Sequence, residues 1–274
     1  MTDQVARFAG AKAALSKVPE VTLSFWVIKI LATTLGETGG DSVTMSLLHA
    51  DANAHNGGYL IGTGIFFAIF VAAVVIQIMT PRFNAGTYWF AIVASTTMGT
   101  AMADFFDRSL GVGYVGGSSI LLACVLASLA LWRGALGSVD VQTVATPRVE
   151  LFYWVTITFS QTLGTALGDW MADDTGLGYG GGALVFVVGL AALGALYYWT
   201  SVSRVFLFWA AFILTRPLGA TVGDFLDKPT SHGGLDFSRP LASAIILAAI
   251  VALILILPQK PGRHPHSTEA VSAE

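Results

Sequence analysis

The chain has 274 residues, of which 54% are hydrophobic and only 11% charged, and its formal net charge is −3. Soluble domains carry about 25% charged residues, so the composition excludes an ordinary soluble domain and indicates a polytopic membrane protein. A negative net charge does not indicate a surface that binds nucleic acid. The single cysteine, Cys124, excludes an internal disulfide and a thiolate-cluster metal site.

From the N-terminus, residues 1–20 carry Arg7, Lys12 and Lys17 but no apolar core followed by a cleavage site. We therefore predict a short amphipathic lead-in and no cleaved signal peptide. Apolar windows long enough to cross a bilayer as helices follow at approximately 21–47, 59–79, 85–107, 114–132, 149–172, 181–200, 203–226 and 239–257. The polar, proline-bearing residues 259–274 predict a disordered cytoplasmic tail.

One pattern recurs in every second span: a tryptophan, a glycine ten residues later and an aspartate fifteen residues later. Its four copies are WVIKILATTLGETGGD (26–41), WFAIVASTTMGTAMAD (89–104), WVTITFSQTLGTALGD (154–169) and WAAFILTRPLGATVGD (209–224). A fixed register of this kind marks a repeat architecture. We predict an all-α transmembrane domain, residues 1–258, with repeats at about 17–79, 80–133, 145–200 and 201–257. Because each repeat contains two spans, the repeats are parallel and are related by an axis along the membrane normal.

The distribution of basic residues predicts the orientation in the membrane. Nine lie in the N-terminus, in the connections after the second, fourth and sixth spans and in the tail: Arg7, Lys12, Lys17, Arg82, Arg133, Arg148, Arg204, Lys260 and Arg263. The opposite loops hold only Arg108, Lys228 and Arg239. We therefore expect both termini in the cytoplasm. The tryptophans then lie near the inner interface, where an indole is well accommodated.

The odd spans carry a polar stripe at positions 8, 11, 15 and 18 after each tryptophan, which fall on one helical face. The stripe consists of Thr34, Glu37, Asp41, Thr44; Thr97, Thr100, Asp104, Asp107; Thr162, Thr165, Asp169, Ala172; and Pro217, Ala220, Asp224, Asp227. An ionisable group in hydrocarbon costs at least about 2.5 kcal/mol, so this face lies against protein or water. Beside it run small residues in pairs four apart, a pattern that lets membrane helices pack closely. We therefore predict an inner bundle of odd helices and an outer ring of even ones.

This arrangement brings one aspartate per repeat to a shared centre, together with Glu37. The predicted metal ligands are Glu37, Asp41, Asp104, Asp169 and Asp224, and the supporting hydroxyls are Thr34, Thr97, Thr100, Thr162 and Thr165. Oxygen ligands without histidine or cysteine favour hard divalent cations such as Mn²⁺, Mg²⁺ or Ca²⁺. Alternatively, the aspartates cap helices or bond across them without a ligand. That is the expectation for the acidic residues nearest the loops, Asp107, Asp173, Asp174 and Asp227.

Two basic residues break the symmetry of the repeats. Lys29 stands where the other repeats have Ile92, Ile157 and Phe212, and Arg216, followed by Pro217, replaces Thr33, Thr96 and Gln161. We interpret Arg216 as an internal counter-ion for the carboxylates, displaced when substrate binds. For Lys29, the same role and snorkelling of its ammonium to the inner interface stay open.

With these four units, the chain resembles a family of bacterial inner-membrane proteins built from four tandem copies of a two-span repeat of unknown function. The likeness covers roughly residues 17–257, and the segment TTLGETGGD is its most distinctive part. It implies a location in the bacterial cytoplasmic membrane and supports four repeats, but it implies no substrate. The fourth repeat departs most from the pattern, with Arg216, Pro217 and Ala220 in place of polar residues.

The leading functional hypothesis is a transporter that exports or exchanges a divalent metal cation, with Mn²⁺ preferred, against protons. The expected partners are the bilayer, the cation and protons. We expect no enzymatic activity, no prosthetic group and no nucleic acid, and a homo-oligomer stays open. An intramembrane aspartyl enzyme using Asp169 and Asp224 is one alternative. A transporter of an organic cation, or of an anion held by Lys29 and Arg216, is another.

Overall fold

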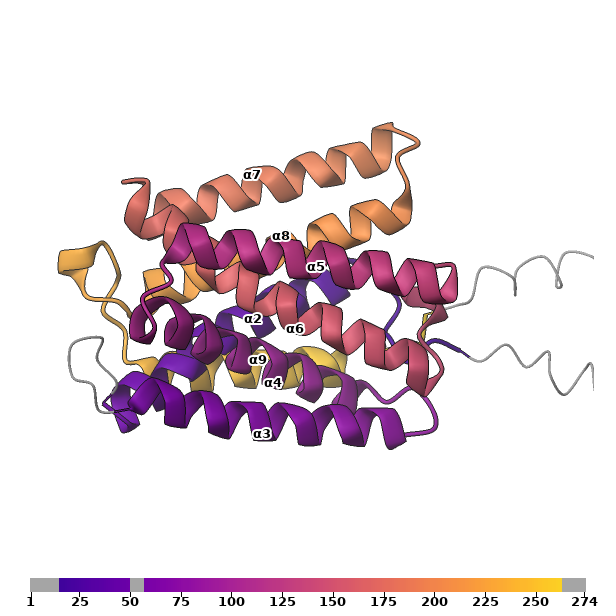
Figure 1. Ribbon diagram of the computed structural model, residues 1–274, viewed down its shortest axis with the longest axis horizontal. Coiled ribbons are helices and arrows are strands. Elements are labelled where there is room, and N and C mark those ends of the chain that lie inside the picture. The colour runs from indigo at the N-terminus through magenta and orange to yellow at the C-terminus, as the bar shows by residue number, and fades with distance from the viewer. Residues whose placement is uncertain (1–14, 50–56, 263–274) are drawn as a thin grey trace, which may run out of the picture.

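The structure is a computed structural model that describes residues 15–49 and 57–262. Its long helices are α2 (Leu23–Asp41), α3 (Gly58–Met79), α4 (Ala85–Asp104), α5 (Tyr114–Leu136), α6 (Pro147–Asp169), α7 (Gly178–Trp199), α8 (Arg204–Asp227) and α9 (Arg239–Ile256). They run along the long axis of the molecule (Figure 1). Short 3-10 turns cover Val141–Thr143 and Thr230–His232, and the described ranges contain no β-strand beyond one isolated bridge between Pro19 and Pro261. The all-α prediction is confirmed. Residues 1–14 and 263–274, most of the predicted lead-in and tail, lie outside the described part.

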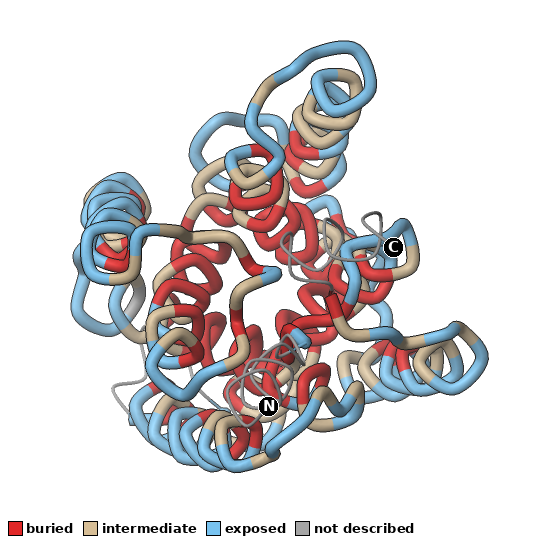
Figure 2. Tube along the Cα trace, turned by 90° about the vertical axis from the view of Figure 1, so that its right-hand side faces the viewer, coloured by how far each residue is buried: buried red, intermediate tan, exposed pale blue. Residues whose placement is uncertain are grey.

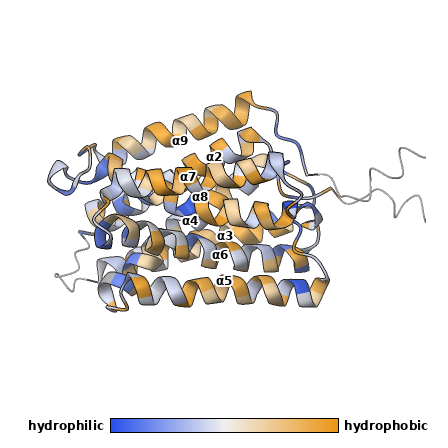
Figure 3. Ribbon diagram, turned by 90° about the horizontal axis from the view of Figure 1, so that it is seen from above, coloured by the Kyte–Doolittle hydropathy of each residue, from blue (hydrophilic) through white to orange (hydrophobic). Residues whose placement is uncertain are grey.

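The helices divide by polarity as expected for a multi-pass membrane protein. Within the described residues, α3, α5, α7, α8 and α9 are long and apolar enough to cross a bilayer. Large apolar side chains on the outer helices stand exposed, and Figure 3 shows α5 and α9 coloured mainly as hydrophobic. Such continuous apolar surface suits lipid rather than water. The other three helices, α2, α4 and α6, carry the polar stripes, which lower their hydropathy.

Four helices form a closed inner ring. α2 packs against α4 and α8, and α6 packs against the same two helices from the opposite side. Viewed along the bundle, the buried residues concentrate on these inner helices, and the outer helices show mostly exposed positions (Figure 2). The predicted inner bundle of odd spans is therefore present.

The glycine of each repeat sets the contact with the next inner helix. A Cβ at any of these glycines would overlap the residue seven places after the next tryptophan in the ring. The four pairs are Gly36 with Thr96, Gly99 with Gln161, Gly164 with Arg216 and Gly219 with Thr33. The same offset at all four interfaces makes the inner helices parallel and in register. Hydroxyls add bonds across two of these contacts: Thr96 Oγ1 donates to the Ala32 carbonyl at 3.1 Å, and Thr33 Oγ1 to the Thr215 carbonyl at 3.1 Å.

Each outer helix packs on the inner helix of the following repeat. α3 lies on α4, α5 on α6 and α7 on α8, and α9 closes the circle by packing on α2. The repeats therefore interlock. This arrangement joins the last repeat to the first, so every inner helix has one outer helix packed against it.

We call the ends of the ring the tryptophan end and the carboxylate end, after the repeat residues found there. Trp89, Trp154 and Trp209 are buried, whereas Trp26 is partly exposed. Three of the four tryptophans are therefore enclosed by protein instead of exposed on the surface of the bundle. The reason is the aromatic residue that precedes each of them, Phe25, Tyr88, Tyr153 and Phe208, all of which are buried. Together these side chains form an aromatic layer in which the Tyr88 and Tyr153 hydroxyls lie 2.7 Å apart.

At the tryptophan end, side-chain hydrogen bonds and an ion pair hold the connecting segments against the helices. Lys17 is buried, and its Nζ donates to Glu150 Oε1 at 2.6 Å and to the Ile78 carbonyl at 3.0 Å. The Trp209 indole donates to the Val139 carbonyl at 2.9 Å, and the Trp89 indole to Gln259 Oε1 at 3.2 Å. These bonds join the segments before α2, after α5 and after α9 to the ring.

Candidate functional site

The carboxylate end is shaped by the way the inner helices finish. α2, α4 and α6 end at their repeat aspartates and continue as π-helical turns over Ser42–Leu47, Phe105–Ser109 and Trp170–Asp174. Such wide turns are rare and are often found at functional sites, because they redirect side chains. The glycines that follow, including Gly57, Gly111 and Gly176, have positive φ, as tight turns require. α8 differs from the other three, since it remains α-helical to Asp227.

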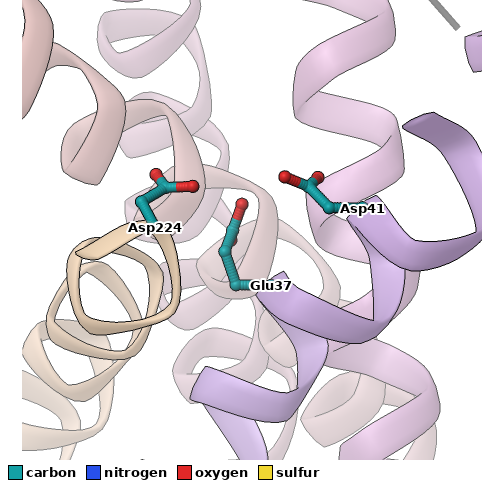
Figure 4. A group of neighbouring side chains, drawn as sticks. All are labelled: Glu37, Asp41 and Asp224. Atoms are coloured by element: carbon teal, nitrogen blue, oxygen red, sulfur yellow. The ribbon is translucent and has the colours of Figure 1, made fainter. Parts of the chain in front are cut away.

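Three carboxylates meet between α2 and α8. The three residues are Glu37, Asp41 and Asp224, and all of them are buried. One carboxylate oxygen from each lies within 4.8 Å of one carboxylate oxygen of the other two. Figure 4 shows the Glu37 carboxylate between those of Asp41 and Asp224. The approach depends on Gly223, where a Cβ would meet the Glu37 side chain at 2.7 Å. We call Glu37, Asp41 and Asp224 the carboxylate cluster.

Arg216 is the buried counter-ion of Glu37. Its Nη1 and Nη2 atoms each lie 3.1 Å from Glu37 Oε2, and the side chain is fully buried. Nη2 also donates to Thr100 Oγ1 at 2.6 Å and to Thr165 Oγ1. One arginine of the fourth repeat thus contacts a polar residue from each of the other three. A buried ion pair is tolerated only when further hydrogen bonds complete it, and the two threonines supply them.

Lys228 is a site residue that the sequence interpretation placed in a loop. Its Nζ lies 2.5 Å from Asp41 Oδ2 and 3.0 Å from Asp224 Oδ1. The residue follows α8 directly, and the returning loop holds it there through a bond from the Asp236 amide to the Lys228 carbonyl at 3.0 Å. Its spacing of four residues from Asp224 was the only sequence signal, because such i, i+4 pairs share a helix face.

The remaining predicted ligands and hydroxyls are distributed around this centre. Asp104 and Asp169 are buried at the same level of α4 and α6, but they are not part of the three-carboxylate group. Of the predicted hydroxyls, Thr100 and Thr165 contact Arg216. The other three bond carbonyls of their own helices, namely Thr34 to Ile30, Thr97 to Val93 and Thr162 to Thr158.

Among the buried side chains that the structure describes at the carboxylate end, more are acidic than basic. Of the buried side chains that the structure describes there, the carboxylates are Glu37, Asp41, Asp104, Asp169, Asp224 and Asp227. The buried cations are Arg216 and Lys228, and Arg239 approaches Asp227 from a partly exposed position. Carboxylates in excess at a buried site retain protons or bind an added cation, because like charges and desolvation both disfavour full ionisation.

Lys29 does not snorkel. It is fully buried, its Nζ lies 4.2 Å from the centre of the Phe212 ring, and it donates no hydrogen bond to any described residue. Its position on α2 is two turns closer to the tryptophan end than Glu37. The structure therefore gives Lys29 an aromatic contact instead of a carboxylate partner.

We expect Lys29→Met to raise the free energy of unfolding by about 1 to 2 kcal/mol, because a buried donor without an acceptor is destabilising by about that amount. Methionine keeps the length of the side chain and the contact with Phe212. Chemical unfolding in detergent measures the change. The exposed Lys260→Met is the control and should stay within about 0.5 kcal/mol of the parent. A loss of stability in Lys29→Met would contradict the geometry described above.

The comparisons with known proteins agree with the repeat pattern. The model of the family described as Repeat of Unknown Function (DUF347) matches residues 24–83, 87–135, 152–203 and 207–258. No curated protein and no solved structure matches the chain. Each match covers one inner helix and the outer helix that follows it, and together they include most of the chain. The chain therefore belongs to the family of proteins built from this repeat of unknown function.

Proposed function

We propose that the protein is a membrane transporter that exchanges a divalent metal cation for protons at the carboxylate cluster. The observation that carries the proposal is the cluster itself: three buried carboxylates from two helices, paired with two cations of the protein, Arg216 and Lys228. A site held closed by its own cations accepts a substrate cation only by releasing them. This property suits a carrier, which must bind and release its substrate.

The ligand chemistry favours a divalent ion that prefers oxygen. Glu37, Asp41 and Asp224 provide carboxylate oxygens, with Thr100 as a neighbouring hydroxyl at 3.2 Å from Glu37 Oε2. Oxygen ligands suit Mg²⁺, Ca²⁺ and Mn²⁺. The Met45 sulfur lies 4.0 Å from Lys228 Nζ, at the edge of the cluster. A thioether sulfur next to the carboxylate cluster favours a transition-metal ion over Mg²⁺ or Ca²⁺, so Mn²⁺ is the preferred substrate.

The exchange follows from charge balance. In the form described here, Lys228 bridges Asp41 and Asp224, and Arg216 holds Glu37. An entering divalent cation would take over these carboxylates, and Lys228 would move away on its loop. Protons on the surplus carboxylates would leave as the cation binds, and would return when it departs. The proposed location is the bacterial cytoplasmic membrane, with the tryptophan end facing the cytoplasm.

Calorimetry on the purified protein in detergent tests the proposal with Mn²⁺, Mg²⁺, Ca²⁺, Zn²⁺ and Co²⁺. We expect saturable tight binding of Mn²⁺ with proton release. Glu37→Gln and Asp41→Asn should each weaken that binding at least about tenfold, because each removes one of three charged ligands. Asp174→Asn, an exposed carboxylate beyond the cluster, should bind as the parent does. If no metal binds and the variants differ from the parent only in stability, the cluster is structural and the proposal fails.

A further inference from the structure

Lys29 is a buried amine to which the exchange at the carboxylate cluster gives no part. It is fully buried on α2, and its Nζ has no hydrogen-bond partner among the residues that the structure describes. The equivalent residues of the other repeats, Ile92, Ile157 and Phe212, are also fully buried, and all three are apolar. An unpaired ammonium is costly in such surroundings, so the side chain is more stable there as the neutral amine.

The surroundings of Lys29 also allow the charged form for a short time. The Nζ atom lies 4.2 Å from the centre of the Phe212 ring, and the face of an aromatic ring attracts a cation. No carboxylate of the described residues forms an ion pair with Lys29 that would hold a proton on it permanently. A group that can accept a proton without keeping it suits a proton carrier, the role in which buried ionisable residues of membrane helices are often found.

The level of Lys29 lies between the carboxylate cluster and the tryptophan end. Glu37 is eight residues further along α2, about 12 Å away at a rise of 1.5 Å per residue. Midway between these two levels in the repeat register stand Arg216 and Gln161. Arg216 Nε and Gln161 Oε1 are buried and have no hydrogen-bond partner among the described residues. Buried polar atoms left unpaired call for an explanation, and their place between two ionisable groups suits a path for protons.

Polar groups continue from Lys29 toward the tryptophan end. One turn away in the repeat register, the buried Tyr88 and Tyr153 hydroxyls lie 2.7 Å apart. On α4 and α8, which pack against α2, the ionisable residues closest to Lys29 in that register are Tyr88 and Arg216. The third helix packed there, α9, carries only Arg239, which lies at the carboxylate end. Lys29 is therefore the ionisable residue at its level of the described bundle.

We propose that Lys29 carries protons between the carboxylate cluster and the tryptophan end during cation exchange. The role rests on the proposed function, since these protons are the ones that an entering cation displaces. The neutral amine accepts one proton released at the cluster and becomes an ammonium. It then gives up that proton toward the tryptophan end and returns to the neutral amine. Lys29 binds no metal in this role, so its removal leaves the cation site intact.

Liposomes reconstituted with the full chain test this role, with Mn²⁺ uptake and internal pH recorded together by enclosed dyes. In the parent, we expect Mn²⁺ and protons to move in opposite directions. Lys29→Met should bind Mn²⁺ in calorimetry as tightly as the parent does. Its Mn²⁺-driven proton flux should fall at least about tenfold, because removal of a group that transfers protons typically costs that much or more. The exposed Lys260→Met is the control and should retain the flux of the parent.

Lys29→Arg separates a proton carrier from a fixed positive charge. Arginine keeps the charge but does not release a proton in proteins, so this variant should lose the flux as Lys29→Met does. Flux retained in Lys29→Met, or restored in Lys29→Arg, overturns the proposal. Loss of Mn²⁺ binding in Lys29→Met also overturns it, because Lys29 would then support the cluster.

A different result marks failure of the proposed function. If the parent binds no Mn²⁺, or moves it without protons, the exchange at the carboxylate cluster fails, and the role of Lys29 fails with it. Should Lys29→Arg fold poorly, the proton flux and Mn²⁺ affinity of Lys29→Met decide the question.

Discussion

Arg216→Met is expected to lower the free energy of unfolding by about 3 to 5 kcal/mol, the range measured when one partner of a buried ion pair is removed. Two guanidinium nitrogens contact Glu37, and the same group donates to Thr100 and Thr165. Its loss leaves Glu37 buried beside Asp41 and Asp224, with a hydrogen bond from the Thr100 hydroxyl but no cation. Chemical unfolding in detergent measures the change.

The double variant Arg216→Met/Glu37→Gln separates the charge from the packing. It removes both ions, and a buried ion pair replaced by neutral side chains is often no less stable. We therefore expect it to recover most of the stability that the single variant loses, a coupling of about 2 kcal/mol or more in a double-mutant cycle. If the single and double variants lose the same free energy of unfolding, Arg216 stabilises the protein by packing, and its charge pairing with Glu37 contributes nothing to stability.

Gly164→Ala is expected to destabilise the protein by about 3 kcal/mol, the upper end of the usual range for overpacking. A Cβ at Gly164 would overlap the side chain of Arg216 and come within 3.0 Å of Pro217 Cδ. Neither neighbour can move freely, because the proline ring is fixed and the arginine is held by Glu37. The loss should appear both as a lower unfolding midpoint and as weaker cation binding.

Gly194→Ala is the matched control for that prediction. Gly194 lies within α7, and a Cβ there would meet nothing within 4 Å. Alanine favours a helix over glycine by about 0.8 to 1 kcal/mol, so this variant should be as stable as the parent or more stable. If both alanines behave alike, the close approach of α6 and α8 does not depend on Gly164.

The repeat pattern determined the framework of the protein. A tryptophan, a glycine and an aspartate in fixed register predicted four units, and the helical period placed polar and small residues on adjacent faces of the odd spans. Burial of ionisable groups away from lipid then required those spans to be inside. The ring of α2, α4, α6 and α8 agrees with that prediction, as does its close packing at Gly36, Gly99, Gly164 and Gly219.

The sequence also singled out Glu37 and Arg216 because each breaks the repeat symmetry. It did not show that they pair, since they stand 179 residues apart. Pairing depends on α8 closing the ring against α2, which no local pattern encodes. The same closure brings Asp224 to Glu37 and Asp41, and leaves Asp104 and Asp169 outside that group.

Tertiary structure alone decided the parts that depend on the path of the chain beyond the helices. Lys228 and Asp227 were assigned to a loop because hydropathy ends the span there, yet both are buried, since the loop folds back and α8 remains helical to Asp227. Likewise, each outer helix packs on the next repeat, although apolar periodicity cannot choose between two neighbouring partners. Local pattern determines which face of a helix is buried; the helix or side chain that covers it is decided only when distant segments meet.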